Sequence, residues 1–309
     1  MVPVVVRCSK CVEDAITYIR YNGTALCPKH LGEFVERRAK KEVRRQLRLD
    51  GPKKLGVAVS GGKDSAVALE LLSNILGRRR DVEIVAITVD EGIFGYRSLT
   101  LEAIRRQTER LGIEHRVVRF QDVVGMELDD LGSRKGERTP CSFCGVFRRR
   151  CLNLESKRLG VDVLATGHNL DDTAQSVLMN FMRGDVERLA RLGPHLKVQP
   201  GLVPRIEPLR LIPEKETFLY ALIKGIEFSD AECPYAADAL RNEYREMVDS
   251  TESRHPGTRH SIVASYDAIR PSLMSSFPQT ELRRCACGEP TCGERCMACE
   301  LLEEIRKRV

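Results

Sequence analysis

Residues 55–65, which read LGVAVSGGKDS, constrain the fold of this chain more than any other segment. The apolar run Leu55–Val59 predicts a buried strand, and the helical apolar pattern of Ala66–Leu76 predicts the helix after it. Between them, the Ser-Gly-Gly of residues 60–62 allows a tight turn close to a ligand, because glycine has no Cβ atom. A strand, a glycine turn and a helix start direct free N–H groups and a helix dipole at one point, which favours a phosphate there.

This loop is not a Walker A loop, because Asp64 follows Lys63 where that motif requires Ser or Thr. Its sequence resembles the pyrophosphate loop of the N-type ATP pyrophosphatases, which cleave ATP between the α and β phosphates and leave AMP on a substrate oxygen. The alternative is a glycine turn without a ligand. The resemblance implies that ATP contacts the loop residues Ser60, Gly61, Gly62, Lys63, Asp64 and Ser65, and that Asp64 also acts in catalysis.

Strands and helices alternate through the centre of the chain, which predicts an α/β fold with a doubly wound parallel sheet. Further strands are predicted at 82–90, 115–120 and 161–165, with helices at 102–111, 144–159 and 171–182. Ligands of such sheets bind at the carboxyl ends of the strands, near a topological switch. Polar residues follow the predicted strands at these ends, which places the candidate site there.

Composition narrows the class of protein. The chain has 309 residues, of which 42% are hydrophobic and 30% charged, and a net charge of +6 that permits a nucleic-acid partner without requiring one. No apolar run is long enough to span a membrane, and residues 2–6 are too short for a signal peptide, so we predict a cytoplasmic protein without a membrane partner. In a reducing compartment, its 12 cysteines indicate metal ligands or catalytic thiols rather than disulfides.

The first cysteines predict a small metal module. Cys8 and Cys11 form one pair, and Cys27 and His30 form a second pair that suits a tetrahedral structural zinc ion. A segment this short cannot bury a core, so the metal would supply the folding energy. The alternative is that these cysteines are buried as small apolar residues.

A basic run follows at 33–49, which predicts a helix that is either a solvated face or a surface for RNA phosphates. Asp50-Gly51-Pro52 ends it. We therefore divide the chain into a zinc module, a linker helix, the nucleotide-binding domain, a helical segment and a second zinc module, with bounds 1–32, 33–52, 53–213, 214–280 and 281–309.

Two further cysteines, Cys141 and Cys144, lie at a predicted loop-to-helix junction. The pair could be half of a zinc site, a redox dithiol or two ligands of an iron–sulfur cluster. Cys151 falls inside the predicted helix, where packing is its expected role. Cys233 is alone in a predicted loop, and three cysteines could hold a cubane while one iron stays open.

Two other segments fall at the predicted strand ends. Asp90 ends a strand, where it could contact ATP or form a turn. Residues 166–172 read TGHNLDD and resemble the second signature of the pyrophosphatase superfamily. In this segment Gly167 would allow close approach and His168 could face the site. Asp171 and Asp172 could cap a helix, or include a Mg²⁺ ligand beside a triphosphate.

These motifs in this order resemble the tRNA 2-thiouridine synthetases of the archaeal and eukaryotic cytosolic thiouridylase family: SGGKDS, VDEGIFGYR, PCSFCGVFRRR, TGHNLDDTAQ, VLMNFMRGD and ECPYA, between two cysteine-rich ends. The resemblance covers nearly the whole chain. It favours the branch that modifies the wobble uridine, U34, over the U54 branch, which has Lys where this chain has Arg148.

The resemblance implies the following ligand sets. Cys141, Cys144 and Cys233 would hold a 4Fe–4S cluster, and Cys8, Cys11, Cys27 and His30 would hold one zinc ion. A second zinc ion would take Cys285, Cys287, Cys296 and Cys299, with Cys292 as a possible replacement because two cysteines separated by one residue are an awkward pair. ATP would also contact Val89, Asp90, Gly167, His168 and Asn169, and the catalytic residues would include Asp172 and Arg148.

The implied reaction is ATP-dependent thiolation of a tRNA uridine, in which ATP and Mg²⁺ adenylate the C2 carbonyl oxygen and sulfur replaces it through the cluster. The implied partners are tRNA, a sulfur donor that is sulfide or a ubiquitin-like sulfur carrier, and a second copy of the chain in a homodimer. Alternatives are thiolation of U54, persulfide chemistry on Cys141 with Cys233 as its resolving partner, and a non-catalytic zinc protein that binds RNA.

Overall fold

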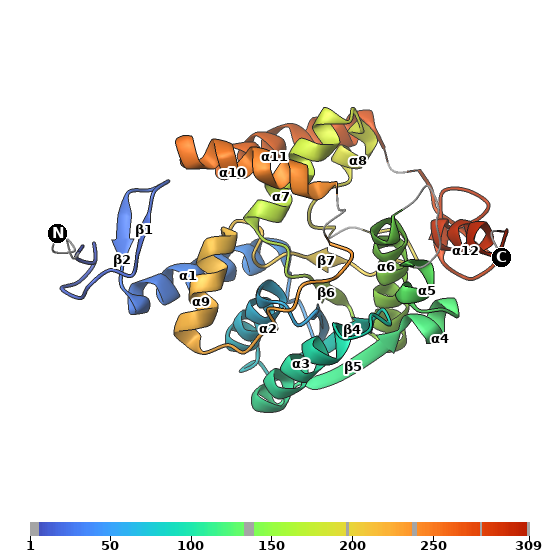
Figure 1. The fold of residues 1–309 in the computed structure, drawn as a ribbon, viewed down its shortest axis with the longest axis horizontal. Coiled ribbons are helices and arrows are strands. Elements are labelled where there is room, and N and C mark those ends of the chain that lie inside the picture. Colours follow the sequence, from blue (N-terminus) through green and yellow to red (C-terminus); the bar gives the residue numbers. More distant parts are fainter. Residues whose placement is uncertain (1–5, 133–138, 196–197, 237–239, 279, 308–309) are drawn as a thin grey trace.

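The computed structural model of the chain describes residues 6–132, 139–195, 198–236, 240–278 and 280–307. Its centre is a five-stranded sheet whose neighbouring strands are all parallel, in the order β5-β4-β3-β6-β7 (Figure 1). The strands are β3 (Lys53–Ala58), β4 (Val82–Asp90), β5 (Glu114–Arg119), β6 (Val163–Ala165) and β7 (Arg205–Ile206). The predicted doubly wound parallel sheet is confirmed.

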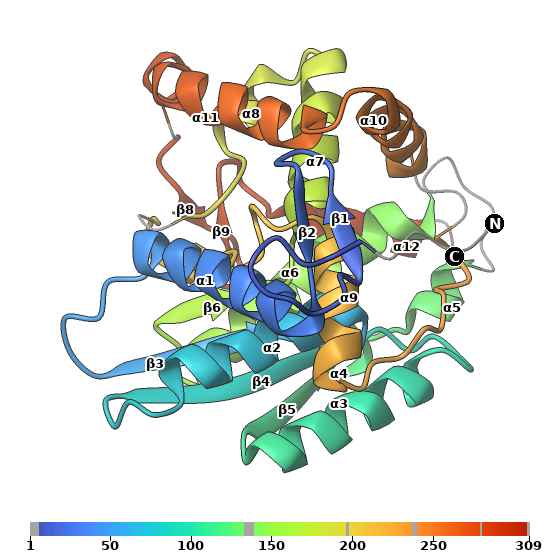
Figure 2. The ribbon, with the colours of Figure 1, turned by 90° about the vertical axis from the view of Figure 1, so that its left-hand side faces the viewer.

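Helices cover both faces of this sheet (Figure 2). Along β4, Val85 and Ile87 join the core beneath one face, whereas Ala86 joins the core beneath the other, because side chains alternate along a strand. The Val85 side packs against α6, and the Ala86 side packs against α1, α2 and α3. These helices are α1 (Pro28–Gln46), α2 (Lys63–Leu76), α3 (Arg97–Leu111) and α6 (Pro140–Arg158).

A second helical layer lies apart from the sheet, at the top of Figure 1. Small apolar clusters hold its helices together, with Leu170, Val248 and Val263 in one cluster and Val177 and Tyr266 in another. The region predicted to be helical after residue 214 contributes to this layer. Its members are α7 (Leu170–Met182), α8 (Val186–Ala190), α10 (Arg241–Arg254) and α11 (Thr258–Ser276), while α9 (Glu214–Lys224) packs on α1 and α2.

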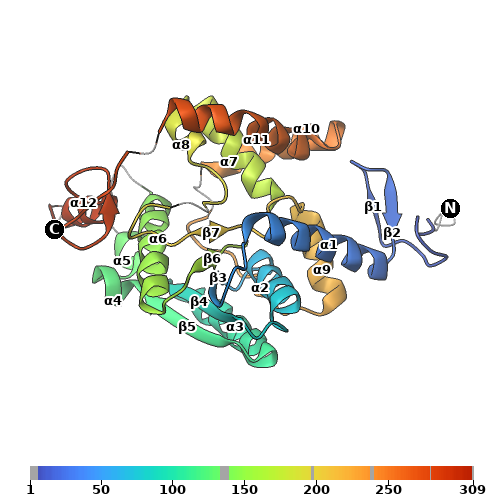
Figure 3. The ribbon, with the colours of Figure 1, turned by 180° about the vertical axis from the view of Figure 1, so that it is seen from behind.

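The two cysteine-rich ends lie at opposite sides of the molecule (Figures 1 and 3). The first contains a hairpin of β1 (Thr17–Ile19) and β2 (Thr24–Leu26), and the last contains β8 (Arg283–Arg284), β9 (Pro290–Thr291) and α12 (Met297–Lys307). Two short helices, α4 (Phe120–Val124) and α5 (Leu128–Gly132), complete the described elements.

Helix α1 begins at Pro28, earlier than the predicted start at residue 33, and the predicted boundary between residues 32 and 33 lies inside it. The division of the chain into domains stays a prediction. Among the described helices, none is both long and apolar enough to cross a membrane.

The strand order explains where a ligand would bind. From β3 the chain continues to β4 and β5 on one side, and then returns to place β6 and β7 on the other side. The switch lies between β3 and β6, so the loops that follow these two strands meet at one edge of the sheet. These are the SGGKDS loop and the TGHNLDD loop.

Candidate active site

The loop after β3 has the backbone geometry that the predicted phosphate site requires. Gly61 has a φ of +88°, and a Cβ atom there would lie 2.7 Å from the backbone oxygen of Thr100. The backbone N–H of Ser60 donates to Ser65 Oγ over 3.0 Å, and Ser65 Oγ donates to the carbonyl oxygen of Gly62 over 2.9 Å. Helix α2 begins directly after Gly62, which directs its first N–H groups at the loop.

The loop after β6 contacts the loop after β3. A Cβ atom on Gly167 would lie 2.8 Å from the backbone nitrogen of Ser65, so only glycine allows the two loops to touch. Asn169 caps α7, since its Oδ1 accepts the Asp172 N–H over 3.0 Å and Asp172 Oδ2 accepts the Asn169 N–H over 3.1 Å. His168 Nδ1 lies 2.9 Å from Thr166 Oγ1. The fold thus brings together the two loops predicted to bind ATP.

Asp64 carries the best candidate oxygen for a cation. One of its oxygens lies 3.1 Å from Lys63 Nζ, and the other, Oδ1, is buried without a hydrogen-bond partner in the described structure. Burial raises the pKa of Asp64, Lys63 lowers it, and the nearby Asp172 raises it. Lys63 Nζ is also 2.5 Å from Glu214 Oε1. Carboxylate oxygens at this position fit the ligand preference of Mg²⁺.

The adjacent carboxylates of Asp171 and Asp172 have different roles. Asp171 is buried and structural: its Oδ2 accepts the N–H of Glu214 over 2.8 Å, and its Oδ1 lies 2.7 Å from Arg259 Nε. Burial raises the pKa of Asp171 to about 6. Asp172 instead lies close enough to Asp64 to raise its pKa, and Asp172 Oδ1 lies 3.4 Å from Arg241 Nη1. Of the two, only Asp172 is placed to act at the loop.

The side chains of the two residues predicted to contact ATP at the end of β4 are used by the fold itself. Asp90 Oδ1 accepts the N–H of Gly92 over 3.0 Å, which is the turn-forming role that its position also allowed. Val89 is 4% exposed and packs in the core, so any contact with a nucleotide would come from its backbone. Both contacts stay predictions.

The three central cysteines approach one another from two distant segments. Cys141 and Cys144 lie in the first turns of α6, which begins at Pro140 rather than at residue 144. Cys141 Sγ donates to the carbonyl oxygen of Tyr235 over 3.1 Å, and Cys233 packs on the core cluster that contains Cys144. Burial raises the pKa of Cys144, Arg148 lowers it, and Glu91 and Cys233 raise it.

This donor set fits a cluster better than a single ion. Within the described residues, these three thiols do not form a compact group of the kind seen at the two chain ends, and no fourth Cys or His completes one. A zinc ion needs four close donors, whereas a cubane takes thiolates that are farther apart. Cys151 is fully buried in the core, as expected for a packing residue, and burial raises its pKa to about 12.

A buried acid connects the cysteines to the glycine loop. Glu91 is 1% exposed and forms an ion pair with Arg97, whose Nη1 donates to the carbonyl oxygen of Ser60 over 3.0 Å. The other carboxylate oxygen of Glu91 lies 3.1 Å from Arg148 Nε, and Arg148 Nη2 donates to Cys144 Sγ over 3.1 Å. Sequence reasoning missed Glu91 and Arg97. The available signal was an acid directly after a predicted strand end, within the VDEGIFGYR motif.

The N-terminal ligand set predicted from sequence comes together as one group. The donor atoms of Cys8, Cys11, Cys27 and His30 all lie within 4.8 Å of one another. His30 Nδ1 lies 3.5 Å from Cys8 Sγ and 3.3 Å from Cys27 Sγ, and Cys11 Sγ is 3.7 Å from Cys27 Sγ. Three sulfurs and one imidazole nitrogen fit a structural zinc ion.

The C-terminal group contains Cys285, Cys287, Cys296 and Cys299 and leaves out Cys292. Cys285 Sγ lies 3.8 Å from Cys299 Sγ, and Cys287 Sγ lies 3.6 Å from Cys296 Sγ. The expected difficulty of using both Cys285 and Cys287 does not arise, because the chain turns between them. Backbone N–H groups of Cys287 and Cys296 lower the pKa of Cys285 to about 6, which favours the thiolate that a metal requires.

The basic run divides into two environments on α1. Arg38 points into the protein, where its Nη1 lies 2.8 Å from Glu216 Oε2 and donates to Tyr21 Oη over 2.7 Å. It is therefore a structural tie and no part of an RNA surface. The other cations are exposed, namely Arg37, Lys40, Lys41, Arg44, Arg45 and Arg48. Their contact with RNA stays a prediction.

The fold and the glycine loop define a nucleotide-binding protein of the PP-loop class, and residues 33–251 match the family described as the PP-loop domain. Residues 7–31 match the N-terminal LIM domain of the 2-thiouridine synthetase TtuA. The chain is 37% identical to the tRNA 2-thiolation protein NcsA of Haloferax volcanii, over 97% of this chain and 99% of that relative. The chain belongs to the PP-loop family of tRNA 2-thiolation proteins, as its motifs predicted.

Two further relatives define the range of this family. A solved structure titled U34-tRNA thiolase NcsA from Methanococcus maripaludis with its 4Fe–4S cluster has a TM-score of 0.84 and 35% identity, and the match covers 98% of this chain and 97% of that one. The tRNA-5-methyluridine(54) 2-sulfurtransferase of Pyrococcus horikoshii is 32% identical, over 98% of this chain and 96% of the relative.

Proposed function

We propose that this protein is a tRNA-uridine 2-sulfurtransferase that uses ATP to thiolate the wobble uridine, U34. The observation that carries the proposal is the adjacency of a phosphate cradle at residues 60–65 and three converging cysteines, with Glu91 connected to both. A carbonyl oxygen at C2 of uridine is a poor leaving group, so a site that replaces it must first activate it and then present sulfur.

The residues divide this work between them. The loop N–H groups and Lys63 hold the phosphates and stabilise the departing pyrophosphate, and Asp64 and Asp172 would hold a Mg²⁺ ion beside it. Cys141, Cys144 and Cys233 would hold the cluster, which supplies an open iron for sulfur when it is bound. Arg148 donates to Cys144 and is placed to stabilise negative charge at that thiolate.

Several finer points belong to the same proposal. U34 is favoured over U54 because identity to the two NcsA relatives is 37% and 35%, against 32% to the U54 enzyme. The terminal groups would each hold one zinc ion, sulfide or a ubiquitin-like carrier would donate the sulfur, and two copies of the chain would form a homodimer in the cytoplasm.

The test is mass analysis of nucleosides from tRNA incubated anaerobically with protein, ATP and sulfide. We expect 2-thiouridine, and nuclease fragments should place it at U34; its presence at U54 would change the site assignment. The absence of any thiolated nucleoside from protein that holds iron would overturn the function. Iron content separates the cluster from persulfide chemistry, since persulfide transfer would proceed without iron.

The Asp64→Asn variant supplies the mechanistic control. It should bind tRNA normally and release no pyrophosphate, because it loses the negative charge that Asp64 holds beside the glycine loop. Asp81→Asn, at an exposed position outside the site, should release pyrophosphate at the wild-type rate. Wild-type release by the Asp64 variant would remove Asp64 from the chemistry.

A further inference from the structure

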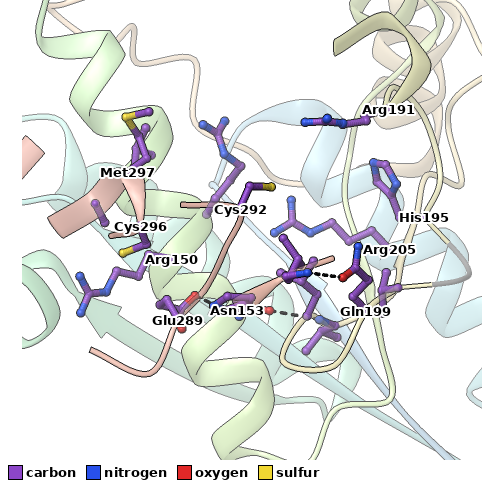
Figure 4. Close-up of a pocket in the computed structure, with 18 of the residues that line it drawn as sticks. Arg150, Asn153, Arg191, His195, Gln199, Arg205, Glu289, Cys292, Cys296 and Met297 are labelled. Atoms are coloured by element: carbon purple, nitrogen blue, oxygen red, sulfur yellow. Dashed lines mark hydrogen bonds between the residues drawn. The ribbon is translucent and has the colours of Figure 1, made fainter. Parts of the chain in front are cut away.

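A second cavity, outside the nucleotide site, lies between α6, the segment before β7 and the C-terminal module (Figure 4). Its volume is about 400 Å³, within the range of small-molecule sites. None of its lining residues belongs to the glycine loop or to the loop after β6. It is therefore separate from the two loops assigned to ATP.

Hydrogen bonds fix the walls of this pocket. Asn153 of α6 is 3% exposed, and its Nδ2 donates to the carbonyl oxygen of Gly201 over 3.0 Å and to Glu289 Oε2 over 3.2 Å. Gln199 Nε2 donates to the carbonyl oxygen of Thr280 over 2.8 Å. The Asn153–Glu289 bond ties the central domain to the C-terminal module, so the pocket is a built feature of the fold.

Part of the positive charge that lines the pocket is not held in ion pairs, although one carboxylate, that of Glu289, also lines it. Arg149 and Arg205 line it, and within the described residues neither forms an ion pair with a carboxylate. Burial lowers the pKa of both guanidinium groups, and repulsion between the two arginines lowers that of Arg205 further. Figure 4 shows Arg205 and His195 reaching into the space that Cys292 faces from the opposite wall. Two crowded cations at one cavity favour an anion between them.

Part of the lining is apolar. Val146, Leu202 and Met297 contribute side chains from three different segments. A free phosphate or sulfate would use the arginines but leave this surface in water. A nucleotide uses both, because its phosphate takes the cations and its ring covers the apolar wall.

We propose that this pocket holds one nucleotide of the tRNA substrate, with its phosphate on Arg149 and Arg205 and its ring on the apolar wall. Arg149 directly follows Arg148 on α6, and Arg205 is the first residue of β7, two positions before Glu207, whose Oε1 lies 4.0 Å from His168 Nδ1. The pocket therefore borders the candidate active site along one edge of the sheet. The C-terminal module would then take part in substrate binding, because it forms one wall of the pocket. This inference rests on the proposed function.

Fluorescence anisotropy of labelled tRNA over a range of KCl concentrations tests the charge. The Arg149→Gln/Arg205→Gln double variant should reduce the log–log salt slope by about 0.7 to 0.9, the contribution of the one phosphate that both arginines contact, and each single variant should reduce it by less. Arg158→Gln is the matched control on the same helix, since Arg158 is 81% exposed and lies outside the pocket. It should keep the wild-type slope.

Leu202→Trp tests whether tRNA binding needs the empty volume of the pocket, and it leaves the charge of the pocket unchanged. It fills the pocket, and tRNA affinity should fall by about tenfold because the excluded nucleotide also loses its phosphate contacts. ATP binding and iron content should match wild type in all of these variants, which shows that they fold.

The outcomes separate the two proposals. If wild-type protein thiolates tRNA while the Arg149, Arg205 and Leu202 variants bind it with wild-type affinity and slope, the pocket assignment is wrong and the function stands. The same conclusion holds if inorganic phosphate binds to the pocket while the variants leave tRNA binding unchanged, because the pocket would then bind free phosphate and no nucleotide of tRNA. If wild-type protein neither binds nor thiolates tRNA, the function and the pocket assignment both fail.

Discussion

The cysteines of this protein occupy two kinds of site that differ in how completely their donors surround a centre. At each chain end, four donor atoms lie within 4.8 Å of one another, so an ion between them would have no free coordination position. In the middle, Cys141, Cys144 and Cys233 meet beside Arg148 and near the glycine loop, without a fourth donor in the described structure. A closed set serves stability, whereas an open set leaves room for a reactant.

The two kinds of site also depend on the fold in opposite ways. The hairpin β1–β2 and the strands β8 and β9 are two or three residues long and bury little by themselves. We therefore expect these segments to need a bound metal in order to fold. Cys144, in contrast, is buried on a 19-residue helix that packs against the sheet, so the fold positions this thiol without a metal.

The strongest test of the open site is Cys233→Ala, for which we expect the largest effect. Loss of one thiolate of three should abolish the cluster and thiolation, while ATP still binds at the glycine loop. Anaerobic iron analysis, the visible absorption spectrum and nucleoside analysis measure these effects.

Cys151→Ala is the matched control for that substitution. Its side chain is fully buried in the same core, so the change should cost about 1 kcal/mol of stability and leave cluster and activity intact. If Cys233→Ala keeps a full cluster and Cys151→Ala loses it, the third ligand has been wrongly assigned.

Substitutions in the two four-donor groups at the chain ends, the closed sites, should remove metal and local structure and leave the chemistry of the active site intact. Cys27→Ser and Cys299→Ser should each remove one zinc ion, because a serine hydroxyl is a poor ligand for it. The module concerned should lose several kcal/mol of folding free energy, since zinc binding is worth about 10 kcal/mol or more in such segments. Metal analysis and hydrogen exchange should locate each effect at one end of the chain, with ATP binding unchanged. An unchanged zinc content in either variant would refute that ligand set.

Sequence periodicity was sufficient for the sheet where strands were long. The apolar segment Val82–Asp90 predicts β4 with the bounds that the structure has, whereas β7 is only two residues long, too short for a periodic pattern to show. Helix α1 begins at Pro28 instead of residue 33, because a proline is well suited to the first turn of a helix.

Contacts between distant segments were harder to predict. Local motifs identify Cys141 and Cys144, but spacing alone does not bring Cys233 to them, and that prediction depended on a family resemblance. Glu91 and Arg97 were missed for the same reason. Their importance comes from contacts with Arg148 and Ser60, which lie tens of residues away in the chain.

Glu91→Gln would show whether the open site is coupled to the glycine loop. Glu91 and Arg97 form a buried pair, so removing the negative charge should cost about 3 kcal/mol of stability. We expect weaker ATP binding and a shifted cluster spectrum in the same variant, because one side chain contacts both arginines. Glu102→Gln, in an exposed ion pair on α3, should change neither measurement. Loss of ATP affinity with an unaltered spectrum would show that Glu91 serves the loop alone.

The smallest expected effect is that of Cys292→Ser, and it tests the boundary of a closed site. Cys292 is exposed and stands outside the four-thiol group, although it lies four residues before Cys296. The variant should therefore keep its full zinc content, and its stability should change by no more than about 0.5 kcal/mol. Because serine is close to cysteine in size, the pocket that Cys292 lines should also keep its volume, and tRNA affinity should stay within twofold of wild type. Loss of one zinc ion would mean that Cys292 replaces Cys285 or Cys287 as a ligand, and the C-terminal group would then not be the closed set that its geometry indicates.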